Sequence, residues 1–293
     1  MTRATSAGRF APSPSADLHI GNLRTALLAW LFARSSGRDF LVRVEDLDDR
    51  ARSDIGARQL ADLAAIGVTW DAAPEYQTAH SARYDAVIDE LSARGLVYEC
   101  YCSRRDILQA PRAPHAPEGA YPGTCRDLSE ADRAHRRAGT KAPALRLRSD
   151  TFTYTVTDLL HGTYTGVVDD LVLRRGDGVV AYNLAVVVDD AAQGIDQVVR
   201  GDDLLASSPR QAYLGALLGY PPPSYAHVPL VLNVEGKRLA KRDGAVTLAD
   251  IGVAAVLAQI AASLSFTATT VEGMLDEFDP ARLPPGPWVY QPM

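Results

Sequence analysis

A strand, turn, helix and second strand near the N-terminus constrain the fold more than any other feature of this chain. From Gly21 onward, apolar residues recur at helical spacing, and Gly37 suits the end of that helix. Residues 40–44 then form an apolar run of strand length. Strands that alternate with helices in this way predict an α/β protein, with a Rossmann-like, doubly wound parallel sheet covered by helices on both faces.

The same alternation continues along much of the chain. Apolar spacing predicts helices that start near Ser53 and Ser81, and a serine followed by proline predicts another that starts at Ser208. Three further apolar segments are predicted to be strands by their composition, namely residues 183–188, 197–200 and 228–232.

Residues 100–178 break this alternation with prolines, short polar strands and all the cysteines of the chain, as an inserted domain would. We therefore expect an inserted α+β domain that splits the parallel sheet. The expected divisions are 1–99 for the first half of the sheet domain, 100–178 for the insertion, 179–235 for the second half, and 236–293 for a basic loop and a short helical tail.

Composition narrows the class of protein further. The 293 residues are 47% hydrophobic and 23% charged, which is typical of soluble globular proteins. No apolar run has the length of a membrane span, and residues 1–8 lack the apolar core of a signal peptide, so we expect a cytoplasmic protein. The net charge of −6 argues against indiscriminate nucleic-acid binding but permits a local basic face.

The three cysteines, Cys100, Cys102 and Cys125, lie within 26 residues of one another. Thiolates at such spacing are typical zinc ligands, and zinc prefers four ligands in structural sites. Tyr121, His115 or water are candidates for the fourth position. Alternatively, the three are reduced, buried thiols without a metal.

Residues 9–22 read as a strand that opens into a proline-rich turn, with His19 and Gly21 at the start of the next helix. Helix N-termini offer free N–H groups and a positive dipole end to phosphates. Residues 237–243 form a basic loop that suits a triphosphate. Taken singly, the first segment is a polar loop that caps a helix, and the second is a solvated charge run.

Together, in this order and about 220 residues apart, the two segments resemble the HIGH and KMSKS signatures of class I aminoacyl-tRNA synthetases. They read His19-Ile-Gly-Asn22 and Arg238-Leu-Ala-Lys-Arg242. The flanking sequences Arg-Phe-Ala-Pro-Ser-Pro, Leu-Val-Arg-Val-Glu-Asp-Leu-Asp and Arg-Gly-Asp-Asp-Leu-Leu are similar to the glutamyl branch. Residues 182–190 and the cysteines resemble the shortened glutamyl-Q tRNA(Asp) synthetases, and we expect no anticodon-binding domain.

The resemblance implies roles for individual residues. Glutamate recognition falls to Arg9, Ala11, Ser13, Glu45, Tyr182 and Arg200. ATP binding falls to His19, Gly21, Asn22, Arg238 and Lys241, of which His19 and Lys241 are also catalytic, with Mg²⁺ on the phosphates. One structural Zn²⁺ per chain is held by Cys100, Cys102, Tyr121 and Cys125. Two positions depart from the general motifs: Asn22 replaces a histidine, and Ala240 replaces a small hydroxyl residue.

The implied activity is ATP-dependent activation of L-glutamate without tRNA, followed by transfer to the queuosine base in the anticodon loop of tRNA(Asp). A truncated glutamyl-tRNA synthetase that charges a tRNA 3′ end is the alternative within the same family. A zinc-containing paralogue that only binds RNA or protein is an alternative of another class. We expect a monomer.

Overall fold

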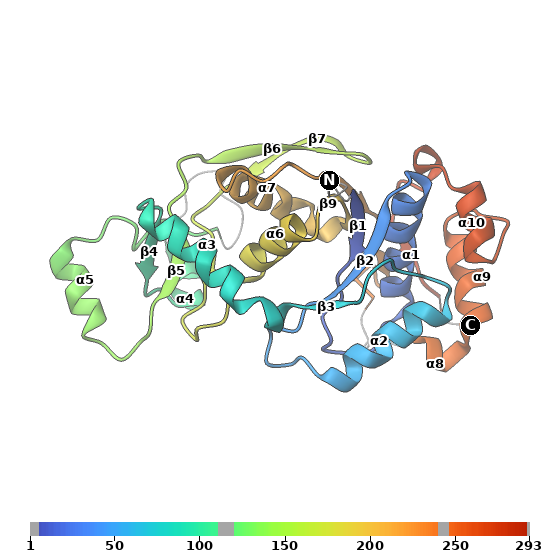
Figure 1. Cartoon of the computed structure of the whole chain (residues 1–293), viewed down its shortest axis with the longest axis horizontal. Helices are drawn as coiled ribbons and strands as arrows, with labels where there is room; N and C mark the ends of the chain where they lie inside the picture. Colours follow the sequence, from blue (N-terminus) through green and yellow to red (C-terminus); the bar gives the residue numbers. More distant parts are fainter. Residues whose placement is uncertain (1–5, 111–119, 240–245, 292–293) are drawn as a thin grey trace.

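A computed structural model of the chain describes residues 6–110, 120–239 and 246–291, and its centre is a seven-stranded sheet (Figure 1). Its order is β3 (Glu75–Tyr76), β2 (Asp39–Val44), β1 (Ala7–Phe10), β9 (Ile195–Gly201), β10 (Ser224–Val228), β6 (Thr153–Asp158) and β7 (Gly162–Val167). Each neighbouring pair is parallel except β6 and β7, which are antiparallel. The predicted parallel α/β sheet is therefore confirmed.

Helices cover both faces of this sheet (Figure 1). One face packs against α1 (Ile20–Ser35), and the other against α6 (Tyr182–Ala192) and α7 (Ser208–Leu217). Successive residues of β9 separate the two cores, because Val199 joins the α1 core while Val198 faces the other way. Two further helices, α2 (Ser53–Ala65) and α3 (Ser81–Ala93), begin at the predicted serines, as α7 does.

Residues 183–188 are part of helix α6, so the prediction of a strand there was wrong. The run is apolar on too many positions to distinguish strand from helix by periodicity alone. In the structure Leu184, Ala185 and Val188 are buried at helical spacing. The predicted strand at 228–232 is also interrupted, since β10 ends at Val228 and β11 (Val231–Leu232) follows as a separate strand.

A smaller antiparallel sheet lies at one end of the molecule. It consists of β4 (Val97–Cys100), β5 (Ala144–Leu147) and β8 (Val172–Arg174), accompanied by α4 (Arg104–Gln109) and α5 (Glu130–Arg137). Figure 1 shows α5 at the far left, away from the main sheet. Strands β6 and β7 also fall between residues 100 and 178, but they hydrogen-bond to the main sheet as its edge.

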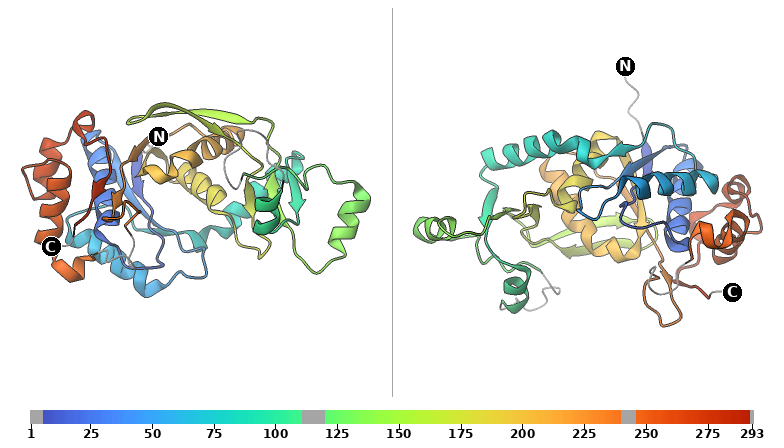
Figure 2. Two further views of the ribbon diagram at one scale, coloured as in Figure 1. Left: turned by 180° about the vertical axis from the view of Figure 1, so that it is seen from behind. Right: turned by 90° about the horizontal axis from the view of Figure 1, so that it is seen from below.

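The C-terminal residues return to the first helix. The helices α8 (Leu248–Ile251), α9 (Val253–Ser263) and α10 (Val271–Glu277) lie beside α1 in both views of Figure 2, and α9 and α10 contact it. Strand β12 (Trp288–Val289) pairs with β11. The described ranges also contain the 3₁₀ turns η1 (Gln77–His80), η2 (Asp202–Ser207) and η4 (Pro280–Arg282). None of the helices in the described ranges is both long and apolar enough to span a bilayer.

Candidate active site

A cavity of about 830 Å³ opens at the carboxyl ends of β1, β2 and β9. These strands lie side by side in the order β2-β1-β9, so the chain leaves β1 toward one neighbour and returns on its other side. Such a reversal in strand order leaves a crevice in which open α/β sheets bind ligands. The N-terminal ends of α1 and α6 also reach this cavity, through Asn22 and Tyr182.

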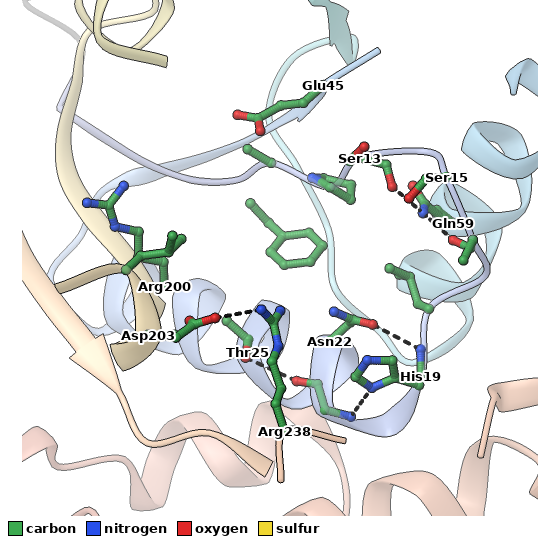
Figure 3. Close-up of a pocket in the computed structure, with 18 of the residues that line it drawn as sticks. Ser13, Ser15, His19, Asn22, Thr25, Glu45, Gln59, Arg200, Asp203 and Arg238 are labelled. Carbon is green, nitrogen blue, oxygen red and sulfur yellow. Dashed lines mark hydrogen bonds and ion pairs between the residues drawn. The ribbon is translucent and has the colours of Figure 1, made fainter. Parts of the chain in front are cut away.

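The structure brings most of the predicted site residues together around this cavity (Figure 3). Those that line it are Arg9, Ala11, Ser13, His19, Gly21, Asn22, Glu45, Tyr182, Arg200 and Arg238. Lys241 and Ala240 lie outside the described residues. Residues more than 200 positions apart in the sequence therefore share one wall, as the paired signatures predicted.

His19 caps the helix that begins the first signature. Its Nδ1 accepts the N–H of Gly21 at 3.1 Å, and the Asn22 side chain accepts the N–H of His19 at 3.2 Å. Burial, and secondarily the charge of Arg238, lowers the pKa of His19 to about 4. The ring is therefore neutral at pH 7, with its proton on Nε2. A Cβ atom at Gly21 would lie 2.9 Å from the His19 ring, so a larger residue here would displace the ring.

The backbone of the turn between β1 and α1 accepts hydrogen bonds from two other parts of the chain. Gln59 of α2 donates to the carbonyls of Ser13 and Ala16 at 3.0 and 2.7 Å. The N–H of Glu45 donates to the carbonyl of Pro12 at 2.9 Å. These bonds fix the turn relative to α2 and to the residue that follows β2.

A buried charge cluster, formed by Arg9, Arg43, Glu45, Asp189 and Asp190, supports one wall of the cavity. Arg9 Nε lies 3.1 and 3.3 Å from the two carboxylate oxygens of Asp190. Arg43 is fully buried and contacts Asp190 at 2.7 Å and Glu45 at 3.3 Å. Burial alone would raise the pKa of Asp190, but Arg9 and Arg43 outweigh it and lower it. Burial raises the pKa of Glu45.

The sequence interpretation missed Asp190 and Arg43 as parts of this site. A pair of acidic residues that follows an apolar run was the available signal, because a charge inside an otherwise buried segment needs a partner. Reading residues 183–188 as a strand hid that signal, since the helix is what turns Asp190 toward Arg9.

The two signature segments lie next to each other in space. Residues 231–239 form a hairpin in which Leu239 donates to the carbonyl of Val231, and the chain then returns at Val246. There the N–H of Ile20 donates to the carbonyl of Val246 at 2.9 Å. Arg238 reaches from the hairpin across the cavity mouth to Asp203 at 2.5 Å (Figure 3).

The three cysteines form a second cluster, in the smaller sheet. Their sulfur atoms all lie within 4.8 Å of one another, and Cys102 and Cys125 are 3.6 Å apart. Sulfur ligands of a tetrahedral zinc ion lie about 3.8 Å apart, given Zn–S bonds of about 2.3 Å. The Tyr121 hydroxyl is 3.4 Å from Cys100 Sγ and accepts the N–H of Cys125 at 2.7 Å. These donors suit one zinc ion.

The family to which this chain belongs is shown by its similarity to known proteins. Residues 7–256 match the family described as tRNA synthetases class I (E and Q), catalytic domain. Glutamate-tRNA synthetase from Elizabethkingia anophelis has the same fold, with a TM-score of 0.82 and 24% identity over 98% of this chain and 68% of that one. The fold and the paired signatures are thus those of a class I aminoacyl-tRNA synthetase catalytic domain.

More similar sequences narrow this class. A glutamyl-Q tRNA(Asp) synthetase from Nocardia farcinica is 64% identical over 97% of this chain and 92% of its own length. A glutamate–tRNA ligase from a Synechococcus species is 42% identical over 83% of this chain but only 52% of its own length. The chain belongs to the glutamyl-Q tRNA(Asp) synthetase family.

Proposed function

We propose that this protein activates L-glutamate with ATP, without needing tRNA, and transfers it to the queuosine base at the wobble position of tRNA(Asp). One observation carries this proposal. Two arginines, a largely buried carboxylate and a neutral histidine at a helix N-terminus line a single cavity. The identity of the acceptor is inferred from the names of similar proteins, such as the glutamyl-Q tRNA(Asp) synthetase of Nocardia farcinica.

The charges along the cavity complement those of glutamate. Arg9 and Arg200 offer guanidinium groups to its two carboxylates, since arginine binds carboxylate oxygens through a planar fork. Glu45 offers a carboxylate to the ammonium, which would counter the effect of burial on this residue. Tyr182, 42% exposed, adds a hydroxyl at the same wall, and the backbone of Ala11 and Ser13 completes it.

Activation needs no general base, because the attacking carboxylate is already charged. One of its oxygens forms a bond to the α-phosphorus of ATP, and the bond from that phosphorus to the bridging oxygen breaks to release pyrophosphate. His19 donates through Nε2 to a phosphate oxygen as charge develops. Arg238 breaks its contact with Asp203 and binds the triphosphate of ATP. Lys241 binds the triphosphate as well. Mg²⁺ bound with ATP would supply charge neutralisation on the phosphates.

Transfer follows from the reactivity of the mixed anhydride. A hydroxyl of queuosine attacks the activated carbonyl carbon, AMP leaves, and an ester remains on the base.

We propose that one structural Zn²⁺, held by Cys100, Cys102, Cys125 and Tyr121, fixes an inserted domain around the smaller sheet. The protein acts as a monomer in the cytoplasm in this proposal.

The acceptor is tested with radiolabelled glutamate and four RNA substrates. We expect label on queuosine-containing tRNA(Asp), the same label on this tRNA after removal of its 3′-terminal adenosine, and none on tRNA(Asp) that carries guanine instead of queuosine. Label that requires the 3′-terminal adenosine, or that appears on tRNA(Glu), would contradict the proposed acceptor. That result would favour charging of a 3′ end.

A further inference from the structure

Arg200, at the end of β9, is held by two partners that lie outside the predicted site. Its Nε donates to His227 Nε2 at 3.0 Å, and its Nη2 donates to Ser208 Oγ at 2.9 Å. The remaining nitrogen, Nη1, is buried and has no hydrogen-bond partner among the described residues. An orphaned donor on a cavity-lining arginine points to a ligand acceptor.

The register of the sheet places His227 beside this arginine. Strands β9 and β10 are parallel neighbours in which Arg200 pairs directly with His227, so the two side chains extend from the same face. Ser208 begins α7 and completes the contact, because its Oγ lies 3.1 Å from His227 Nε2. All three side chains are at least nine-tenths buried.

The proton on His227 is fixed by its neighbours. Arginine Nε only donates, so His227 Nε2 must accept and the ring proton must lie on Nδ1. Nδ1 therefore donates a hydrogen bond to Asp158 Oδ2, which lies 2.6 Å away. Burial and the charge of Arg200 lower the pKa of His227, although Asp158 acts in the opposite direction. Because its pKa is lowered, the ring is neutral.

Asp158 is itself fully bonded at the end of β6. Its Oδ2 also accepts the backbone N–H of His227 at 3.0 Å, and its Oδ1 accepts the N–H groups of Leu160 and His161 at 2.9 and 3.0 Å. Burial would raise the pKa of Asp158, but these bonds outweigh it and lower it. An anionic carboxylate and a cationic guanidinium therefore face each other across a neutral ring.

We propose that Asp158 and His227 are positioning residues for Arg200, which they hold so that Nη1 is presented to a carboxylate of the amino-acid substrate. The inference rests on the proposed function, because it assigns that carboxylate to glutamate. Neither residue touches the substrate. Holding the guanidinium before the ligand arrives removes the cost of ordering a long side chain on binding.

Three substitutions of His227 separate this role from simple packing. His227→Leu removes both ring nitrogens. His227→Asn keeps a donor at the Nδ1 position, two bonds from Cβ, but has no atom, and so no acceptor, at the Nε2 position that Arg200 contacts. His227→Gln places an amide oxygen three bonds from Cβ, where Nε2 lies, and so restores the acceptor. The Asn and Gln variants form a matched polar pair that remains informative if the Leu variant does not fold.

Isothermal titration calorimetry on the full chain measures the dissociation constants for L-glutamate and for ATP separately. We expect the constant for glutamate to rise about 100-fold in the Leu and Asn variants, and by less than about tenfold in the Gln variant, because small misplacements of a binding group have effects of this size. The constant for ATP should stay within about twofold in all three, since His227 does not line the nucleotide side of the cavity.

Equal glutamate affinity in the Asn, Gln and unmodified proteins would overturn the inference, and so would a parallel loss of ATP affinity. An unmodified protein that binds ATP but no glutamate would contradict the proposed function itself. These failures are distinguishable, because the first requires normal glutamate binding by the unmodified chain.

Discussion

The charge cluster at the cavity and the cysteine cluster in the smaller sheet both bury groups that are unstable as isolated charges. They differ in which groups would balance those charges. In the charge cluster, Arg43 is balanced by the carboxylate of Glu45, just after β2, and by that of Asp190 in α6. The three cysteines have one another and Tyr121 instead, and burial with the neighbouring Cys100 raises the pKa of Cys102 to about 12.

The difference predicts which part of the molecule would gain more stability from a bound ion. The cavity is supported by the large core around α1, whereas the cysteines lie in a core of a few residues, with Tyr98 and Tyr121. The large core around α1 thus supports the cavity, while the cysteine region has little apolar core of its own, so a metal bound there would add stability to that region. Changes in one region should have effects that the other does not share.

Removing the central carboxylate of the charge cluster should have the largest effect. Asp190→Asn leaves two buried guanidinium groups without their shared anion and should lower the free energy of unfolding by about 3–5 kcal/mol. Urea denaturation measures this change. Asp196→Asn is the matched control, since its pair with Arg38 is only partly buried and should change stability by less than about 1 kcal/mol. Equal effects of the two substitutions would show that the cluster does not support the fold.

Crowding the first signature should slow catalysis without unfolding the protein. Gly21→Ala places a Cβ 2.9 Å from the His19 ring, which must move, so we expect the kcat of ATP–pyrophosphate exchange to fall about 100-fold. Gly215→Ala in α7 is the control, because its nearest contact is an ordinary 3.8 Å and exchange should be unchanged. A kcat within about twofold of the unmodified protein would mean that the His19 position is not critical.

Breaking the cysteine cluster should mainly affect its own region. Cys125→Ser should reduce bound zinc, measured by atomic emission, from one per chain to a small fraction, and should speed proteolysis between residues 97 and 174. Glutamate-dependent exchange should fall by less than about tenfold, because no cysteine lines the cavity. Thr124→Ser is an exposed neighbouring control. Unchanged zinc content would exclude Cys125 as a ligand.

Acid should have the smallest of these effects, through His19. Its pKa is about 4 in the folded chain and about 6.5 when unfolded, so stability is full above pH 6.5 and is lost as the pH falls toward 4. Between pH 7 and pH 6 we expect a loss of at most about 0.7 kcal/mol. His19→Asn keeps a helix-capping side chain but does not titrate, so urea titrations of this variant should lack that loss. An identical pH dependence in both proteins would contradict a buried, neutral His19.

Local patterns in the sequence predicted the parallel sheet and the helices from Ser53, Ser81 and Ser208, whereas the residues around the cavity were predicted from the family resemblance. They did not predict α6, because a valine-rich run fits a strand as well as a buried helix. Asp158 and His227 were also missed. They come together only through the pairing of β6, β9 and β10, and strand order is not encoded in any local spacing.

The central claim is that this cavity activates glutamate by itself, and ATP–pyrophosphate exchange without tRNA tests it most directly. With folded, zinc-loaded protein, we predict exchange that depends on L-glutamate, requires no RNA, and is lost when Arg9 or Arg200 is replaced by alanine. Exchange that appears only after tRNA is added would favour a synthetase that charges a 3′ end. No exchange under either condition would contradict the account.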